Sequence, residues 1–260
     1  MNSYLWLAYP ALVSLLLLTG LYHRAWWQKT TELPSFVFWL GRLGGGLLVG
    51  SLIWAGVTRQ HVPPTGLDEV LLVLSGLLLL LLLKQQATGD TSQGVLAIGF
   101  GVVVILLGIG VVMTGRGNIY VGVEPLWLWG LLARWLILLA QAGLAWLALL
   151  ASLALWCEIT KNTALKTTLF GSTAHTDGLP LRWQPILIGL LAVGGSLYWL
   201  RDWWGWGHQI NRGLGVVMVL LLLLGAEWLR FTSPYRRWWS WSFTIGAFIA
   251  SLLALGGLAA

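Results

Sequence analysis

Apolar runs of about 20 residues, the length that crosses a bilayer as a helix, follow one another along almost the whole chain. Eight such runs can be counted. They cover residues 4–22, 35–56, 67–83, 94–113, 127–156, 184–200, 213–231 and 239–258. Helices satisfy their own backbone hydrogen bonds in lipid, and no run alternates with period two as a barrel strand would. We therefore predict an all-α fold, a polytopic transmembrane bundle of about eight helices.

The composition excludes a soluble protein, because 58% of the residues are hydrophobic and only 9% are charged. We expect a single integral membrane domain over residues 1–260, surrounded by the lipid bilayer. The net charge of +6 is interpreted as a topology signal, so no nucleic-acid partner is predicted. The lone Cys157 excludes a disulfide framework. The first run lacks a basic leader and a cleavage site, and we expect it to be retained as a helix.

Basic residues predict the orientation, because cytoplasmic connections carry more lysine and arginine than external ones. Nine lie in the odd-numbered connections: Arg24, Lys29, Lys84, Lys161, Lys166, Arg182, Arg230, Arg236 and Arg237. Four lie in the even-numbered connections: Arg59, Arg116, Arg201 and Arg212. The odd connections, including the longest at 157–183, are therefore predicted to be cytoplasmic. Both termini and the tryptophan-rich connection at 201–212 are predicted to lie on the outer side.

Two arginines, Arg42 and Arg134, fall within predicted helices. Such charges are costly in lipid; they either reach for the interface or serve a function. Asp68 and Glu69 begin the third run, after a plausible N-cap at Thr65, where acidic side chains complement the helix dipole. The sequence thus explains the two acids structurally and leaves the role of the two arginines open.

The tryptophan-rich stretch "YWLRDWWGWGHQINRG" admits two interpretations. Tryptophan is common at membrane interfaces, which alone can account for it. Alternatively, the rings form a shelf for a flat ligand such as haem, whose propionates an arginine can pair with and whose iron a histidine can bind. A second external histidine, His61, precedes a Pro-Pro turn, where a solvated loop histidine is the simplest interpretation.

Three segments resemble the CcsA/ResC/HemX-type cytochrome c assembly family, haem-handling membrane proteins with a tryptophan-rich "WWD" loop. "RQHVPPTGLDEVL" matches a family element at His61, Pro63 or Pro64, Glu69 and Leu71. "EPLWLWGLLARWLILLAQAGLAW" matches a proline-led helix at Pro125, Trp135 and Leu136. "GGSLYWLRDWWGWGHQINRGLGVV" matches the loop at Trp203, Trp204 and Trp206. The resemblance implies a bacterial inner membrane, or an organelle or thylakoid membrane derived from one.

The chain departs from the family pattern at most of its histidines. Leu139 stands where the family has the histidine of W-L-x-x-H, and the W-D-P-K-E element becomes Trp206-Gly207-His208-Gln209-Ile210. The later family histidines have no counterpart, so His61 alone matches one of them, and His208 is an addition. Two hypotheses follow.

In the first hypothesis the chain binds or handles haem without covalent chemistry. Its cofactor-binding residues would be His61 and His208 on the iron, Trp203, Trp204 and Trp206 stacked on the ring, and Arg201 and Arg212 on the propionates. An apocytochrome c would be a partner. No HExxH, P-loop, GxSxG or CxxC motif occurs, so no catalytic residue is predicted and a non-enzyme is favoured.

In the second hypothesis the chain is an accessory structural subunit that has lost haem binding and packs against other membrane subunits. Glycines at 41, 44, 45, 46 and 50 would allow close helix approach. The same glycines would equally serve the chain's own bundle. A solute transporter is a weaker third class, because no inverted repeat or paired midplane carboxylates are visible.

Overall fold

The computed structural model describes residues 5–29, 33–59, 67–88, 92–113, 127–161, 169, 219, 221–225 and 240–249. All secondary-structure elements within these ranges are helices, and no strand occurs among them. The chain divides into two compact units. The N-terminal unit comprises Met1–Tyr120 with Thr167–Ser172, and the C-terminal unit comprises Val121–Lys166 with Thr173–Ala260.

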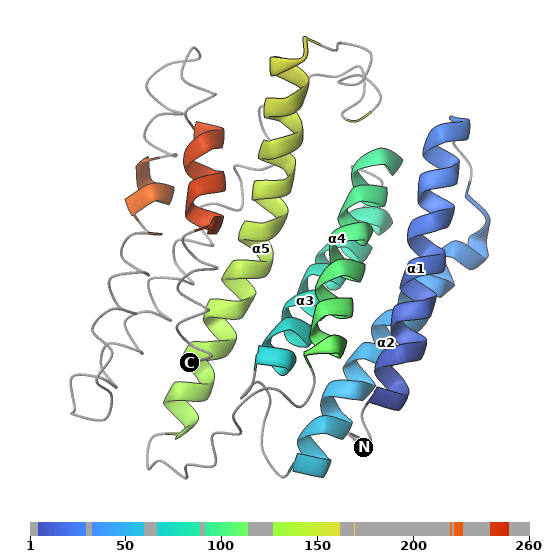
Figure 1. The fold of residues 1–260 in the computed structure, drawn as a ribbon, viewed down its shortest axis with the longest axis vertical. Helices are drawn as coiled ribbons and strands as arrows, with labels where there is room; N and C mark the ends of the chain where they lie inside the picture. The colour runs from blue at the N-terminus through green and yellow to red at the C-terminus, as the bar shows by residue number, and fades with distance from the viewer. Residues whose placement is uncertain are drawn as a thin grey trace. The chain divides into compact units, whose positions relative to one another are not determined.

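Five long helices make up most of the described structure (Figure 1): α1 (Leu5–Gln28), α2 (Ser35–Arg59), α3 (Leu67–Thr88), α4 (Gln93–Val112) and α5 (Trp127–Ile159). Each is long and apolar enough to cross a bilayer, as expected for a helical integral membrane protein. The segment Ser240–Ile249 is a shorter apolar helix. The count of eight helices, the outward termini and the single membrane domain stay predictions.

Four helices, α1, α2, α3 and α5, extend beyond the C-terminal ends of their predicted spans, and the extensions of α1 and α3 exceed one turn. The α1 helix continues to Gln28 instead of ending at residue 22, and α3 continues to Thr88 instead of residue 83. The extension of α1 follows Tyr22, whose buried ring lies 5.2 Å from the Phe100 ring of α4, and its own Ala25 is buried as well. The side chain of Gln86, in the added part of α3, hydrogen-bonds Tyr22. The lengths of the apolar runs underestimate the lengths of α1 and α3, because polar residues near a helix end can still pack inward.

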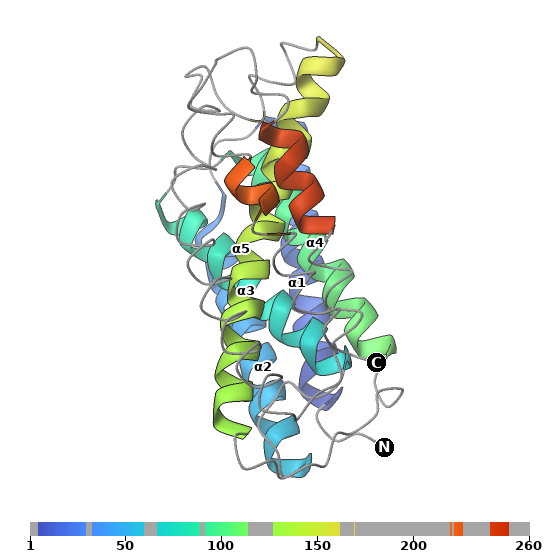
Figure 2. The same ribbon diagram turned by 90° about the vertical axis from the view of Figure 1, so that its left-hand side faces the viewer.

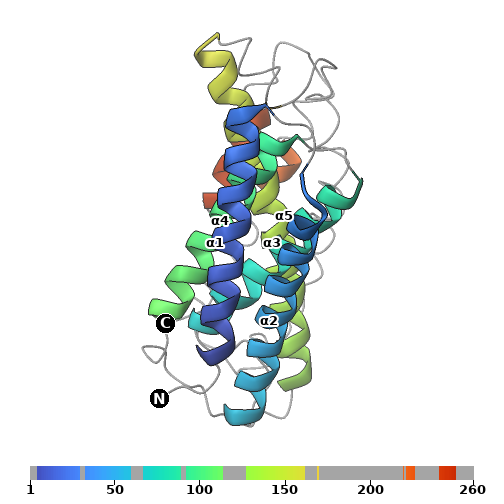
Figure 3. The ribbon, with the colours of Figure 1, turned by 90° about the vertical axis from the view of Figure 1, so that its right-hand side faces the viewer.

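The four helices of the N-terminal unit form a closed ring. The α1 helix packs on α2 and α4, and α3 packs on the same two neighbours. Consecutive helices run antiparallel (Figure 2, Figure 3), as their short connections require. We call the end of this unit where α1 ends and α2 begins the α1–α2 end. The opposite end, where α2 ends and α3 begins, is the α2–α3 end.

Glycines of α2 allow this helix to approach α1 and α3 closely. A Cβ at Gly44 would lie 2.7 Å from Ser14 Oγ on α1, and one at Gly41 would lie 2.8 Å from Leu83 on α3. Gly45 and Gly50 also face side chains of the same unit, whereas nothing lies within 4 Å of a Cβ at Gly46. Of the two roles that the sequence left open, packing within the chain's own bundle therefore accounts for four of the five glycines.

The outer surface of α1 has the pattern of a membrane-spanning helix. Trp6 and Trp27 are 71% and 77% exposed. They stand 21 positions apart (27 − 6), which corresponds to a rise of about 32 Å along the helix axis. The hydrocarbon core of a bilayer is about 30 Å thick. Exposed apolar side chains fill the interval between them, at Val13, Leu16 and Leu17. The two tryptophans are thus spaced to anchor at opposite interfaces.

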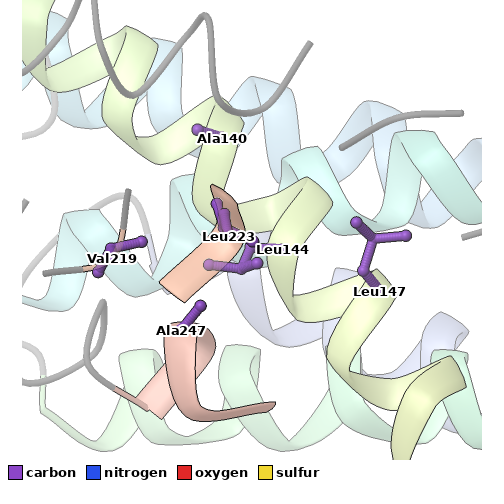
Figure 4. Close-up of a cluster of buried hydrophobic side chains, with 6 residues drawn as sticks. All are labelled: Ala140, Leu144, Leu147, Val219, Leu223 and Ala247. Atoms are coloured by element: carbon purple, nitrogen blue, oxygen red, sulfur yellow. The ribbon is translucent and has the colours of Figure 1, made fainter. Parts of the chain in front are cut away.

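In the C-terminal unit, α5 supplies the core. A cluster of buried side chains joins α5 to the segments around 219–225 and 240–249 (Figure 4), namely Ala140, Leu144, Leu147, Val219, Leu223 and Ala247. Helical residues at 219, 221–225 and 240–249 fall within two of the predicted runs. The predicted run at 184–200 lies outside the described residues.

Truncating Leu223 to alanine is expected to lower the free energy of unfolding by about 2 kcal/mol, because it leaves a cavity in this cluster. The matched control is Leu221→Ala, whose side chain is 62% exposed and whose loss should cost less than about 0.5 kcal/mol. Cys157 is buried in the same unit, so the rate at which a thiol-reactive dye labels it on heating reports unfolding. Equal labelling midpoints for the two variants would contradict the packing in Figure 4.

Candidate functional site

The seven side chains predicted to hold haem lie outside the described residues: His61, His208, Trp203, Trp204, Trp206, Arg201 and Arg212. The predicted approach of His61 to His208 and the tryptophan shelf therefore stay predictions. The structure does describe the helices next to His61, and α5 at the position where the family histidine is replaced.

The connection that carries His61 follows Arg59 at the end of α2 and precedes Leu67 at the start of α3, so it belongs to the α2–α3 end. Asp68 and Glu69 occupy the first turn of α3, as expected. Both are buried, with 2% and 0% of their surface exposed, and both have interaction partners. Carboxylates at the positive end of a helix are favoured by its dipole.

The start of α3 is also packed tightly against the end of α4. A Cβ at Gly110 would lie 3.4 Å from the main-chain oxygen of Asp68 and 3.2 Å from the Leu71 Cβ. Sequence reasoning identified the helix start but not this burial, because acidic residues in a first turn usually face water. The residues directly after the His61 connection are thus held firmly within the N-terminal unit.

On α5, the position that the resemblance aligns with a histidine carries an apolar side chain on an exposed surface. Leu139 is 41% exposed, between the buried Leu138 and Ala140. Trp135 and Leu136, which match the family pattern, are half-buried. The side chain of Arg134 lies outside the described residues. A leucine cannot bind iron, so this position contributes no ligand.

The second helix arginine is described fully. The Arg42 guanidinium lies 4.1 Å from the centre of the Phe38 ring and 5.3 Å from that of Trp39. Both rings precede Arg42 by about one turn, so the charge is directed toward the α1–α2 end. Of the two roles that the sequence left open for this arginine, the geometry corresponds to the one in which the side chain reaches for the interface. The arginine follows the two aromatic residues by three and four positions. That spacing places side chains on one face of a helix, so it could have predicted the cation–π contacts from the sequence.

The α1–α2 end also holds a contact that the sequence did not predict. Leu169, from the long connection at 157–183, is buried in the N-terminal unit. It lies beside Gly94 on α4, where a Cβ would meet both Leu169 and Trp26. The hydroxyl of Ser92, which caps α4, donates a hydrogen bond to the main-chain oxygen of Leu169. Part of the connection expected to be extramembrane is therefore anchored to the helical bundle.

Within the described part of the chain, no group of three or more His, Cys, Asp or Glu side chains is placed to hold a metal ion. No family model, no curated protein and no solved structure matches the chain.

Proposed function

We propose that this protein handles haem at the outer surface of its membrane, as the resemblance to the cytochrome c assembly family implies. The single observation that best supports this is the setting of Glu69. Glu69 matches the family element that contains His61, and it is fully buried at the start of α3. The first turn of α3, which contains Glu69 eight residues beyond His61, is therefore packed within the N-terminal unit, and this favours a built site nearby over a solvated loop.

Haem is the cargo in this proposal, and the chain binds it without forming a covalent bond. The imidazoles of His61 and His208 suit iron, and the guanidinium groups of Arg201 and Arg212 suit propionate carboxylates. Trp203, Trp204 and Trp206 offer apolar ring faces for the porphyrin. Attachment to an apocytochrome c, where it occurs, belongs to a partner.

An accessory structural subunit is the second candidate function. It is favoured by Leu139, which puts an exposed apolar side chain where the family has a histidine. An exposed leucine on a membrane helix suits lipid or a neighbouring subunit and cannot ligate haem iron. The glycine stripe of α2 lends this alternative little support, since four of its five members face the chain's own helices or side chains.

The protein purified from haem-replete cells is expected to show a Soret band and a pyridine haemochrome. His61→Ala and His208→Ala should each lower haem affinity by about tenfold or more, which corresponds to about 1.4 kcal/mol, because each removes one bond to iron. The chain supplies matched controls in its two other histidines, His23 and His175. His23 lies on α1 at the α1–α2 end, with its ring 5.5 Å from that of Trp26. The variants His23→Ala and His175→Ala should leave the spectrum unchanged.

A colourless preparation that still co-purifies with other membrane subunits would exclude haem handling and support the accessory role. A coloured preparation with unchanged spectra in both His61→Ala and His208→Ala would remove the ligand assignment.

A further inference from the structure

Arg42 lies on an exposed surface of α2, one of the helices long and apolar enough to cross a bilayer. It is the eighth residue of the helix (42 − 35 + 1), so its Cα lies about 10 Å along the axis from the first residue. The neighbouring side chains on the same exposed surface, Trp39 and Leu43, are 66% and 56% exposed. A cation at this place is costly unless it reaches the interface and finds an anion.

The aromatic contacts satisfy the faces of the guanidinium but not its edges. Phe38 and Trp39 contribute ring faces, which attract the positive charge but accept none of the five N–H groups in the guanidinium plane. Among the described residues Arg42 has no carboxylate partner and no hydrogen-bond acceptor. Unsatisfied donors near hydrocarbon are expensive, and an anionic acceptor with several oxygens would satisfy them.

The described charged side chains at the end of the unit where Arg42 lies are basic. The described side chains at the α1–α2 end include Arg24, Lys29 and Lys84 and no acidic residue. The positive end of the α2 dipole adds to the same potential. Two acidic residues, Glu32 and Asp90, belong to the connections at this end and lie outside the described residues. Exposed Trp27 and Trp39 mark the depth at which lipid headgroups lie.

We propose that Arg42, held over Phe38 and Trp39, binds the phosphate of an anionic phospholipid in the leaflet at the α1–α2 end. The planar guanidinium matches two phosphate oxygens at once, the ring faces fix its direction, and Leu43 lies beside the acyl chains. The inference is independent of haem and would hold for either candidate function.

Native mass spectrometry of the purified full chain, with phosphatidylglycerol or phosphatidylcholine added to the detergent, tests this site. The wild-type protein should retain phosphatidylglycerol in preference to phosphatidylcholine. Arg42→Gln should weaken phosphatidylglycerol binding about tenfold. Arg42→Lys should weaken it about threefold to fivefold, because lysine keeps the charge but lacks the planar fork. Phe38→Leu keeps the arginine, removes one ring and should also weaken phosphatidylglycerol binding. This variant tests the site if Arg42→Gln does not fold.

Four results would overturn the proposal. Arg42→Lys that binds phosphatidylglycerol as tightly as the wild type would show nonspecific attraction to anionic lipid. Equal losses in Arg42→Gln and in the control Lys84→Gln would show the same. Thermal stabilisation by inorganic phosphate equal to that by phosphatidylglycerol would show a site for free anions. Glu32→Gln should leave lipid binding undiminished; a loss equal to that of Arg42→Gln would make a protein carboxylate essential to the site.

Discussion

Leucine in place of Gly44 is expected to lower the free energy of unfolding of the N-terminal unit by about 3 kcal/mol, or to prevent its folding. Even a Cβ at this position would lie 2.7 Å from Ser14 Oγ and 3.0 Å from two side-chain atoms of Leu15. Ser14 cannot easily move, because its hydroxyl is buried and donates a 2.8 Å hydrogen bond to the main-chain oxygen of Ala11. A leucine side chain would therefore force α2 away from α1, and overpacking of this kind costs about 1–3 kcal/mol or more.

Gly46→Leu is the matched control, because it makes the same change two residues along the same helix. Gly46 is exposed, and nothing lies within 4 Å of a Cβ there. This variant gains the helix propensity of leucine, close to 1 kcal/mol, and should be neutral or slightly stabilising. Thermal unfolding in detergent, followed by far-ultraviolet circular dichroism, measures the stability of both variants. Equal midpoints in the two variants would contradict the packing of α2 on α1.

Leu169→Asp is expected to free its segment from the N-terminal unit and to speed trypsin cleavage at Lys166 by about tenfold or more. The leucine side chain is 2% exposed, and a carboxylate there would lose its hydration, which costs several kcal/mol. Each 1.4 kcal/mol of that cost shifts the equilibrium tenfold. When the segment detaches and rebinds faster than trypsin cuts, the cleavage rate is proportional to the fraction of molecules in which the segment is detached. The single hydrogen bond from Ser92 to the main-chain oxygen is worth about 1 kcal/mol and cannot compensate.

Leu169→Met provides the comparison, because it conserves volume and apolarity and should cost less than about 1.5 kcal/mol. Its cleavage rate should stay close to that of the wild type. If Leu169→Asp is cleaved no faster than Leu169→Met, the contact with Gly94 and Trp26 does not hold this segment.

The residues that the structure explains best are those whose partners are close in sequence. The direction of the Arg42 side chain has a local cause, because a helix projects its side chains toward its own start, and Phe38 and Trp39 stand one turn earlier. The acidic first turn of α3 was expected for the same local reason. The burial of Glu69 and Leu169 was not, because it depends on α4 and on segments distant in the chain. The candidate haem residues stay at the stage of a sequence prediction.

The sequence by itself determined that this is a helical membrane protein, because the length and apolarity of its runs match the thickness of a bilayer whose interior demands internally satisfied backbones. It also placed the starts of α2, α3 and α4 within a residue of those observed. Only the tertiary structure decided that Tyr22 packs on Phe100, and that Gly44 faces Ser14 whereas Gly46 faces outward. Neighbouring glycines are chemically identical, and which of them is indispensable depends on which helix lies opposite.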